Sequence, residues 1–310
     1  MSPSKSINAL GELSSQLAGA VETAANSVVA IHARRRIPSS GVVWRDGVIV
    51  SASHTVRRDG EVPVVLPNGD EATATVVGRD AATDLIALKV AGAKPYVATK
   101  ADTDSARVGS LVLAVGRPGR TATASFGIVS GVGDAWRTWQ GARIDRVLRL
   151  DVAVYDGFSG GALVDAAGRV IGINNSALAR GAPLTLPADA VDRVLDELLA
   201  HGHVRRAYIG VAVHPVVLGE SVIKHHGLTT DNALMVMSVA DKSPAAAAGI
   251  VVGDVLVEAA GNALRRPTDL LDLLSGAGVG TSFEIKHLRG TELRTVTLTP
   301  VDRGAAGERE

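Results

Sequence analysis

Three residues of this sequence carry the side chains that a serine nucleophile and its base require: His54, Asp84 and Ser159. A hydroxyl is a weak nucleophile until a neighbouring imidazole accepts its proton, and a buried carboxylate then orients the imidazole and stabilises its charged form. His54 ends an apolar run, Asp84 begins another, and Ser159 lies in a glycine-rich stretch between apolar segments. The pattern predicts that Ser159 attacks, that His54 acts as base and then acid, and that Asp84 orients His54.

The glycines around Ser159 allow two interpretations. Gly157, Gly160 and Gly161 permit positive φ and close approach of another molecule, which an oxyanion hole made of backbone N–H groups requires. A tight turn needs the same glycines and is the commoner explanation of such a stretch by itself. The histidine and aspartate segments favour catalysis, with the N–H groups of Gly157 and Ser159 as oxyanion donors.

Other polar residues compete for these roles. Without the Asp84 and Ser159 segments, His54 itself would be interpreted as a histidine at a strand end whose hydrogen bonds are satisfied within the fold. Asp80 is a rival carboxylate, but it precedes a turn-like Ala-Ala-Thr, whereas Asp84 leads directly into an apolar run. We therefore expect Asp80 to be a solvated turn residue and Asp84 to be the buried one.

Metal and phosphate sites are not predicted. His201 and His203 lie at the expected end of a helix, where histidines more often interact with the helix dipole. The adjacent histidines at 225–226 have no carboxylate or cysteine at ligand spacing. The glycines at 116–133 are not followed by Lys-Ser or Lys-Thr, so they form no phosphate loop. We expect neither a metal nor a cofactor.

Composition is consistent with a globular chain of two or three domains. The 310 residues are 46% hydrophobic and only 3% aromatic, so the core must consist of Val, Ala, Leu and Ile. The 32 basic and 32 acidic residues balance, which gives no electrostatic argument for binding nucleic acid or an anionic membrane. The chain has no cysteine, which excludes disulfides and thiolate metal sites.

The elements that position the three residues are mostly short strands. From about residue 27 to 174, short β-branched runs alternate with Gly, Pro, Asn and Asp, which indicates a β-rich body. Apolar residues at helical spacing predict an amphipathic helix over 6–24 and another that begins near Ala188 and ends at Gly202. Farther on, the pattern predicts helices that begin at Pro244 and Pro267.

The order of these motifs resembles that of the HtrA/Deg family of trypsin-like serine proteases with a C-terminal PDZ domain. His, Asp and Ser occur in the chain order of chymotrypsin. The resemblance runs from about residue 28 to 300 and includes the segments around His54, Asp84 and Ser159. The other matching segments are Ser-Gly-Val-Val at 40–43, Leu-Pro-Asn-Gly at 66–69, Val-Val-Gly-Arg-Asp at 76–80, the run 108–116, Gly-Ile-Val-Ser at 127–130 and Val-Ile-Gly-Ile-Asn at 170–174. The sequence departs from the family pattern beside the active residues, with Ser53, Phe158 and Ala162 where alanine, asparagine and proline are usual.

The resemblance implies a mainly β fold: a chymotrypsin-like double β-barrel followed by an α+β PDZ domain. Two six-stranded barrels would hold the active site between them, with His54 and Asp84 from the first and Ser159 from the second. The expected divisions are an N-terminal helical segment at 1–26, a protease domain at 27–202, a PDZ domain at 203–302 and a disordered tail at 303–310.

The resemblance also implies a function: a serine endopeptidase that cleaves unfolded or misfolded proteins in protein quality control. Its PDZ domain would bind C-terminal or extended peptide segments by strand addition, and Tyr208, Ile209, Gly210 and Val211 resemble the carboxylate-binding loop. Assembly into a homo-oligomer is a further family property. The alternative is a non-catalytic, chaperone-like binding protein in which the oxyanion hole is not formed.

The N-terminal residues bear on location. Glu12, Gln16, Glu22 and Asn26 interrupt every apolar run in the first 40 residues, which therefore lack the continuous core of a signal peptide, and no stretch approaches a membrane span. This pattern predicts a cytoplasmic protein, or a periplasmic or extracellular one if an upstream export signal was omitted.

Overall fold

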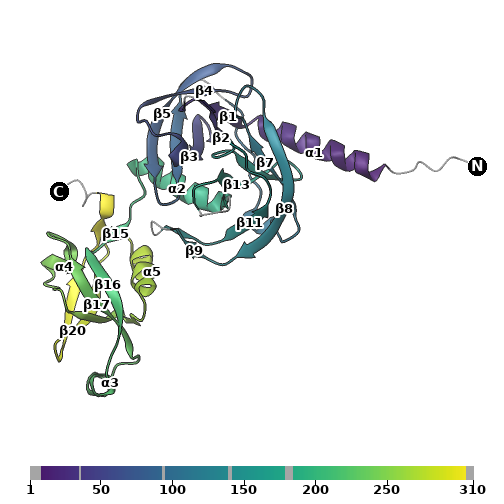
Figure 1. Ribbon diagram of the computed structural model, residues 1–310. Coiled ribbons are helices and arrows are strands. Elements are labelled where there is room, and N and C mark those ends of the chain that lie inside the picture. Colours follow the sequence, from purple (N-terminus) through teal and green to yellow (C-terminus); the bar gives the residue numbers. More distant parts are fainter. Residues whose placement is uncertain (1–7, 35, 93–94, 139–141, 179–183, 305–310) are drawn as a thin grey trace, which may run out of the picture. The chain divides into compact units, whose positions relative to one another are not determined.

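The computed structural model describes residues 8–34, 36–92, 95–138, 142–178 and 184–304 (Figure 1). The chain divides into two compact units, residues 1–204 and 205–310. Each unit is described by itself below. Residues 6 and 7 of the expected first helix and residues 305–310 of the expected tail lie outside the described residues.

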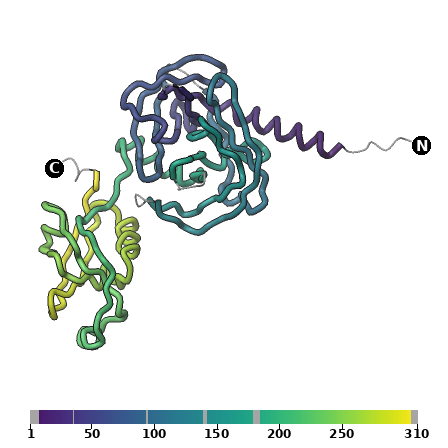
Figure 2. Tube along the Cα trace, in the orientation of Figure 1, coloured from purple at the N-terminus to yellow at the C-terminus, as the bar shows by residue number. Residues whose placement is uncertain are grey.

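The first unit contains two closed barrels of six antiparallel strands, which confirms the double-barrel fold expected from the sequence (Figures 1 and 2). The first barrel has the strand order β1-β2-β3-β6-β5-β4, and the second has the order β11-β14-β13-β12-β7-β8. Strands of the first barrel are β1 (Val28–Ile31), β2 (Ser39–Arg45), β3 (Val48–Ala52), β4 (Glu61–Val65), β5 (Glu71–Asp80) and β6 (Leu85–Val90). Strands of the second are β7 (Leu111–Gly116), β8 (Thr123–Gly133), β11 (Val147–Asp151), β12 (Ala162–Asp165), β13 (Val170–Asn175) and β14 (Leu184–Pro187).

Aliphatic side chains fill the first barrel. Successive residues of a strand point to opposite faces, so each strand directs every second side chain into the barrel. Val29, Ile31, Ile49, Ile86 and Leu88 are all buried without measurable exposure. Burying such a side chain contributes about 1.5–3 kcal/mol. The barrels are therefore held by many small aliphatic contacts, in agreement with the low aromatic content.

Short elements complete the first unit. A 3₁₀ turn, η1 (Ser53–Thr55), follows β3, a second, η2 (Thr103–Ser105), precedes β7, and β9 (Trp136–Arg137) pairs with β10 (Arg143–Ile144). Helix α1 (Ala9–Ala25) begins at Asn8, whose side chain accepts from the Gly11 N–H, and it buries Ala20 and Ala24. Helix α2 (Ala188–His201) ends at Gly202, whose φ of 77° is the left-handed conformation of a helix C-cap.

The second unit contains a sheet of six strands, a separate two-stranded pair and, among the described residues, the helices named below. Its main path is β16-β17-β18-β20-β21, with β19 paired to β18, and β16 therefore forms one edge. The strands are β15 (Ala207–Tyr208), β16 (Val211–Val217), β17 (Asn232–Val239), β18 (Val255–Ala259), β19 (Asn262–Ala263), β20 (Phe283–Arg289), β21 (Glu292–Leu298) and β22 (Val301–Asp302), with β15 and β22 pairing separately. The helices are α3 (Glu220–His226), α4 (Pro244–Ala247) and α5 (Pro267–Ala277).

None of the helices in the described residues is both long enough and apolar enough to cross a membrane.

Candidate active site

The structure joins His54 and Asp84 directly. His54 lies in η1 after β3, and Asp84 lies in the turn between β5 and β6, opposite η1 because Ala52 of β3 pairs with Leu85 of β6. His54 Nδ1 is 2.5 Å from Asp84 Oδ2, and the His54 backbone N–H donates to Asp84 Oδ1 at 2.7 Å. One carboxylate thus fixes both the ring and the backbone of the histidine.

Asp84 is held in a conformation that few residues other than glycine adopt. Its φ is +54°, in the left-handed region, where Asp and Asn are enriched among non-glycine residues. Its backbone C=O accepts the Ser53 N–H at 2.8 Å, and the residue is buried. The surrounding hydrogen bonds hold this uncommon backbone conformation so that the carboxylate faces His54.

Asn175 contributes a further hydrogen bond that sequence reasoning missed. It ends β13 of the second barrel, and its Nδ2 donates to Asp84 Oδ2 at 2.7 Å. Asn175 Oδ1 accepts the N–H groups of Ala177 and Leu178. The amide therefore links the carboxylate of the first barrel to the barrel that carries Ser159. The available signal was the pair Asn174-Asn175 directly after the apolar run 170–173.

If the chain has the endopeptidase activity that the sequence pattern predicts, Asn175→Ala should lower its kcat about tenfold to a hundredfold, because a hydrogen bond to a charged group contributes about 1.5–3 kcal/mol. Initial rates on fluorescein-labelled casein would measure the change. Thr185→Val is the control, since it removes a neighbouring buried hydrogen bond, from Thr185 Oγ1 to Asn174 Oδ1. Equal losses in both variants would show that Asn175 has no specific effect on Asp84.

Asp80 is not the solvated turn residue that the sequence suggested. It is only 3% exposed, and its carboxylate accepts hydrogen bonds from the Thr83 N–H and hydroxyl. The physical reason is that Asp80 caps the tight turn 80–84, and the last residue of that turn is Asp84. Asp80 shapes the turn, while Asp84 contacts the histidine.

Ser159 lies in the loop between β11 and β12, and its hydroxyl hydrogen-bonds to the Ser176 hydroxyl at 2.8 Å. Within the described residues, no hydrogen bond links Ser159 Oγ to the His54 ring. Catalytic hydrogen bonds are often absent or long without substrate and form in the complex. Ser176 is the second residue that the sequence analysis missed; a lone serine after β13 carries no recognisable signal.

Two of the three glycines around Ser159 have the positive φ that the sequence permits. Gly157 has a φ of 88° and Gly160 a φ of 85°. The Phe158 N–H donates to the Tyr155 C=O at 3.0 Å, and the Gly161 N–H donates to the Phe158 C=O at 2.8 Å. Since the N–H and C=O of a trans peptide point in opposite directions, the second bond turns the Ser159 N–H away from Gly161.

The Phe158 side chain is held in this loop by packing rather than by polar contacts. Its ring is 2% exposed and lies edge-on to Tyr155, with ring centroids 5.5 Å apart. An added Cβ on Gly116 would come within 2.9 Å of the Phe158 ring, so the strand β7 lies directly against it. The phenyl ring is thus part of the core of the second barrel.

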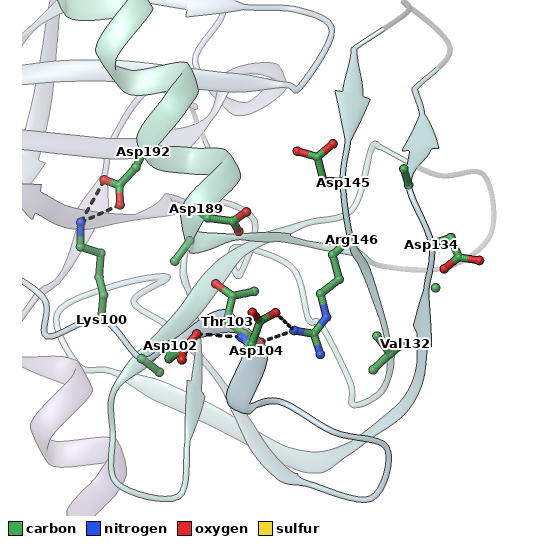
Figure 3. Close-up of a pocket in the computed structure, with 14 residues that line it drawn as sticks. Lys100, Asp102, Thr103, Asp104, Val132, Asp134, Asp145, Arg146, Asp189 and Asp192 are labelled. Atoms are coloured by element: carbon green, nitrogen blue, oxygen red, sulfur yellow. Dashed lines mark hydrogen bonds and ion pairs between the residues drawn. The ribbon is translucent and has the colours of Figure 1, made fainter. Parts of the chain in front are cut away.

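A pocket of the first unit is lined by residues other than these. Its volume is about 670 Å³, and aspartates and two cations line it (Figure 3). The cations already pair with carboxylates, Lys100 with Asp192 and Arg146 with Asp104. None of the three predicted catalytic residues lines this pocket.

The predicted peptide-binding loop of the second unit joins β15 to β16. The Ile209 C=O accepts the Ala245 N–H at 2.9 Å, and the Gly210 C=O accepts the Ala240 N–H at 2.8 Å. Both carbonyl groups therefore face the segment 240–245, and the N–H groups of Gly210 and Val211 point the opposite way. Gly210 has a φ of 81°, and a Cβ added there would collide with Ser243.

Two family models match the chain. The model described as a trypsin-like peptidase domain matches residues 39–173, and the model described as a PDZ domain matches residues 208–299. These ranges contain the candidate triad and the candidate peptide-binding loop, respectively.

Curated relatives and solved structures match most of the chain. The chain is 33% identical over 290 residues to a probable periplasmic serine endoprotease DegP-like of Brucella suis, covering 89% of this chain and 55% of that protein. It is 32% identical over 280 residues to the serine protease Do-like HtrB of Bacillus subtilis, covering 84% and 61%. The solved structure of the HtrA-type protease AlgW with a decapeptide is 25% identical, with a TM-score of 0.75 over 93% of this chain and 98% of that one. The chain spans little more than half the length of the curated relatives it matches.

Proposed function

Because the chain belongs to the HtrA/Deg family of trypsin-like serine proteases with a C-terminal PDZ domain, we propose that it is an endopeptidase of unfolded or misfolded proteins. The observation that carries this proposal is the hydrogen bond of 2.5 Å between His54 Nδ1 and Asp84 Oδ2, in a chain whose second barrel presents a serine in a glycine loop. Its role would be protein quality control.

The proposed reaction follows from this geometry. Asp84 holds the proton on Nδ1 of His54, which leaves Nε2 to accept the proton of Ser159. Ser159 Oγ then leaves Ser176 and attacks the substrate carbonyl carbon, and the N–H groups of Gly157 and Ser159 receive the negative oxygen. Protonated His54 gives its proton to the leaving amine, and water hydrolyses the acyl-enzyme by the same steps. The reaction requires no metal or cofactor.

One observation favours the alternative of a binding protein without catalysis. The Ser159 hydroxyl hydrogen-bonds to Ser176, and within the described residues it makes no hydrogen bond to the His54 ring that would accept its proton. Cleavage of casein by the purified protein, lost on substitution of Ser159, would decide for the endopeptidase. Binding of casein without new fragments would decide for the alternative.

The second unit would supply substrate binding. Strand β16 is at the edge of its sheet, so an extended peptide can add to it through backbone hydrogen bonds. The N–H groups of Gly210 and Val211 would receive the terminal carboxylate. The HtrA-type protease AlgW was solved with a decapeptide, which supports peptide ligands for this family architecture.

We expect Gly210→Ala in the full chain to weaken binding of a fluorescent peptide with a free hydrophobic C-terminus at least about tenfold, since one unmade charged hydrogen bond costs that much. Fluorescence anisotropy would measure the affinity. Gly261→Ala is the matched control, because Gly261 also has a positive φ, of 77°, but an added Cβ there meets nothing within 4 Å. Deletion of residues 205–310 should abolish the binding and leave the reactivity of Ser159 largely intact. Unchanged affinity in both the Gly210 variant and the deletion would remove the binding role.

Location is part of the proposal. The cytoplasmic location expected from the first 40 residues has no support among the relatives, several of which are named periplasmic. We therefore propose that the protein is periplasmic or extracellular, which was the other location considered from the sequence.

A further inference from the structure

The Gly157 N–H belongs to the peptide group between Asp156 and Gly157, and the orientation of this group depends on the neighbouring peptide group. Neither the Asp156 C=O nor the Gly157 N–H of that group has a hydrogen-bond partner within the part of the chain that the structure describes. By contrast, both the C=O of Gly157 and the C=O of Ser159 are bound. The orientation of the first oxyanion donor is therefore set by what holds the Gly157 carbonyl, together with the φ of 88°.

Ser40 is the residue that holds this carbonyl. Its Oγ donates to the Gly157 C=O at 2.7 Å, and its backbone N–H donates to the Ser159 C=O at 3.3 Å. Ser40 lies on β2 of the first barrel and has no measurable exposure. One residue of the first barrel thus binds the carbonyl groups on both sides of Phe158.

The Ser40 hydroxyl has one possible direction for its proton. The Arg117 backbone N–H donates to Ser40 Oγ at 2.7 Å, so the hydroxyl accepts on that side and directs its only proton to Gly157. Arg117 is 5% exposed, and its guanidinium donates to the carbonyl groups of Ala25, Val28 and Arg120. The residue that orients Ser40 is therefore itself fixed by three backbone contacts.

We propose that Ser40 is a positioning residue of the oxyanion hole, whose hydroxyl fixes the Gly157 carbonyl and so aims the Gly157 N–H at the reacting oxygen. This rests on the proposed function, because it assigns Ser40 a part in catalysis by Ser159. Without the hydroxyl, the Gly157 C=O and the Arg117 N–H both lose a buried partner. The loop then relaxes, and one oxyanion donor is lost or misdirected.

The test uses Ser40→Ala and Ser40→Cys in the full-length protein. The thiol nearly preserves the volume of the site but is a weak donor. We expect kcat on fluorescein-labelled casein to fall at least about tenfold in both variants, within the hundredfold to thousandfold range for loss of one oxyanion donor. KM should change little, because the loop acts on the transition state. A peptide boronate, which forms a tetrahedral adduct with the serine, should lose inhibitory potency by the same factor as kcat/KM.

Ser27→Ala is the matched control, since Ser27 is also buried and its hydroxyl donates to a backbone carbonyl, that of Ala24. Thermal unfolding of every variant accompanies the kinetics, and Ser40→Cys decides if Ser40→Ala does not fold. Full kcat in the folded Ser40 variants, or an equal loss in Ser27→Ala, would overturn the role of Ser40. Absence of cleavage by the unsubstituted protein would instead overturn the proposed endopeptidase.

Discussion

Replacing Ser159 by alanine is expected to lower the rate of casein cleavage about 10⁴- to 10⁶-fold, and His54→Ala and Asp84→Asn should each cause losses of several orders of magnitude. The three groups act as a unit, so removal of any one loses most of their joint effect. Asp84→Asn should be the mildest, because the amide keeps the shape of the turn but cannot stabilise a charged imidazole. Quantitative fragment analysis at matched enzyme concentration would measure the rates.

Two substitutions of exposed residues that make no described side-chain hydrogen bond with the candidate site control for handling and folding. Ser130→Ala lies on the exposed side of β8, and His32→Ala replaces an exposed histidine of the first barrel. Both should retain full activity. If Ser159→Ala cleaves casein as fast as these controls, the activity does not come from Ser159 and the endopeptidase assignment fails.

The second large effect is expected at the oxyanion loop. Gly157→Ala should lower kcat about a hundredfold to a thousandfold, the usual result of losing one oxyanion donor. An added Cβ would lie 2.6 Å from the Pro118 Cβ and 2.8 Å from the Pro38 carbonyl oxygen, and neither atom belongs to a flexible side chain. The φ of 88° is also unfavourable for alanine. The loop must therefore move, and the Gly157 N–H moves with it.

Gly109→Ala separates this effect from the general cost of a left-handed alanine. Gly109 has the same φ of 88°, but nothing lies within 4 Å of an added Cβ. Backbone strain should cost both variants a similar amount of stability, and the collisions should add to this loss in thermal unfolding of Gly157→Ala alone. Only Gly157→Ala should lose most of its kcat. Comparable activities of the two variants would contradict an oxyanion role for Gly157.

The fold could be predicted largely from the order of motifs. The strand-rich pattern, the helix that ends at Gly202 and the resemblance to HtrA proteases together gave two six-stranded barrels followed by a PDZ domain, as observed. Local periodicity could not show that the barrels close, because closure depends on pairing between strands far apart in sequence, such as β1 with β4.

The proposed site could be predicted only where its chemistry has a local sequence signal. His54, Asp84 and Ser159 stand beside apolar runs or glycines, whereas the hydrogen bonds of Asn175 and Ser40 span 91 and 117 residues of chain. Their partners are decided by which strands meet between the barrels, and no spacing rule encodes this. The sequence predicts Asp80 in solvent because turn residues usually are, but its carboxylate is buried and accepts the Thr83 N–H and hydroxyl.

The most direct test of the central claim is labelling of the native protein with a fluorophosphonate, followed by mapping of the labelled peptide by mass spectrometry. An activated serine reacts far faster than an ordinary hydroxyl. We expect label on Ser159 alone, strongly slowed in His54→Ala and abolished when the protein is unfolded in urea. Labelling of native Ser159 no faster than in the unfolded chain would contradict the proposed activation of this serine.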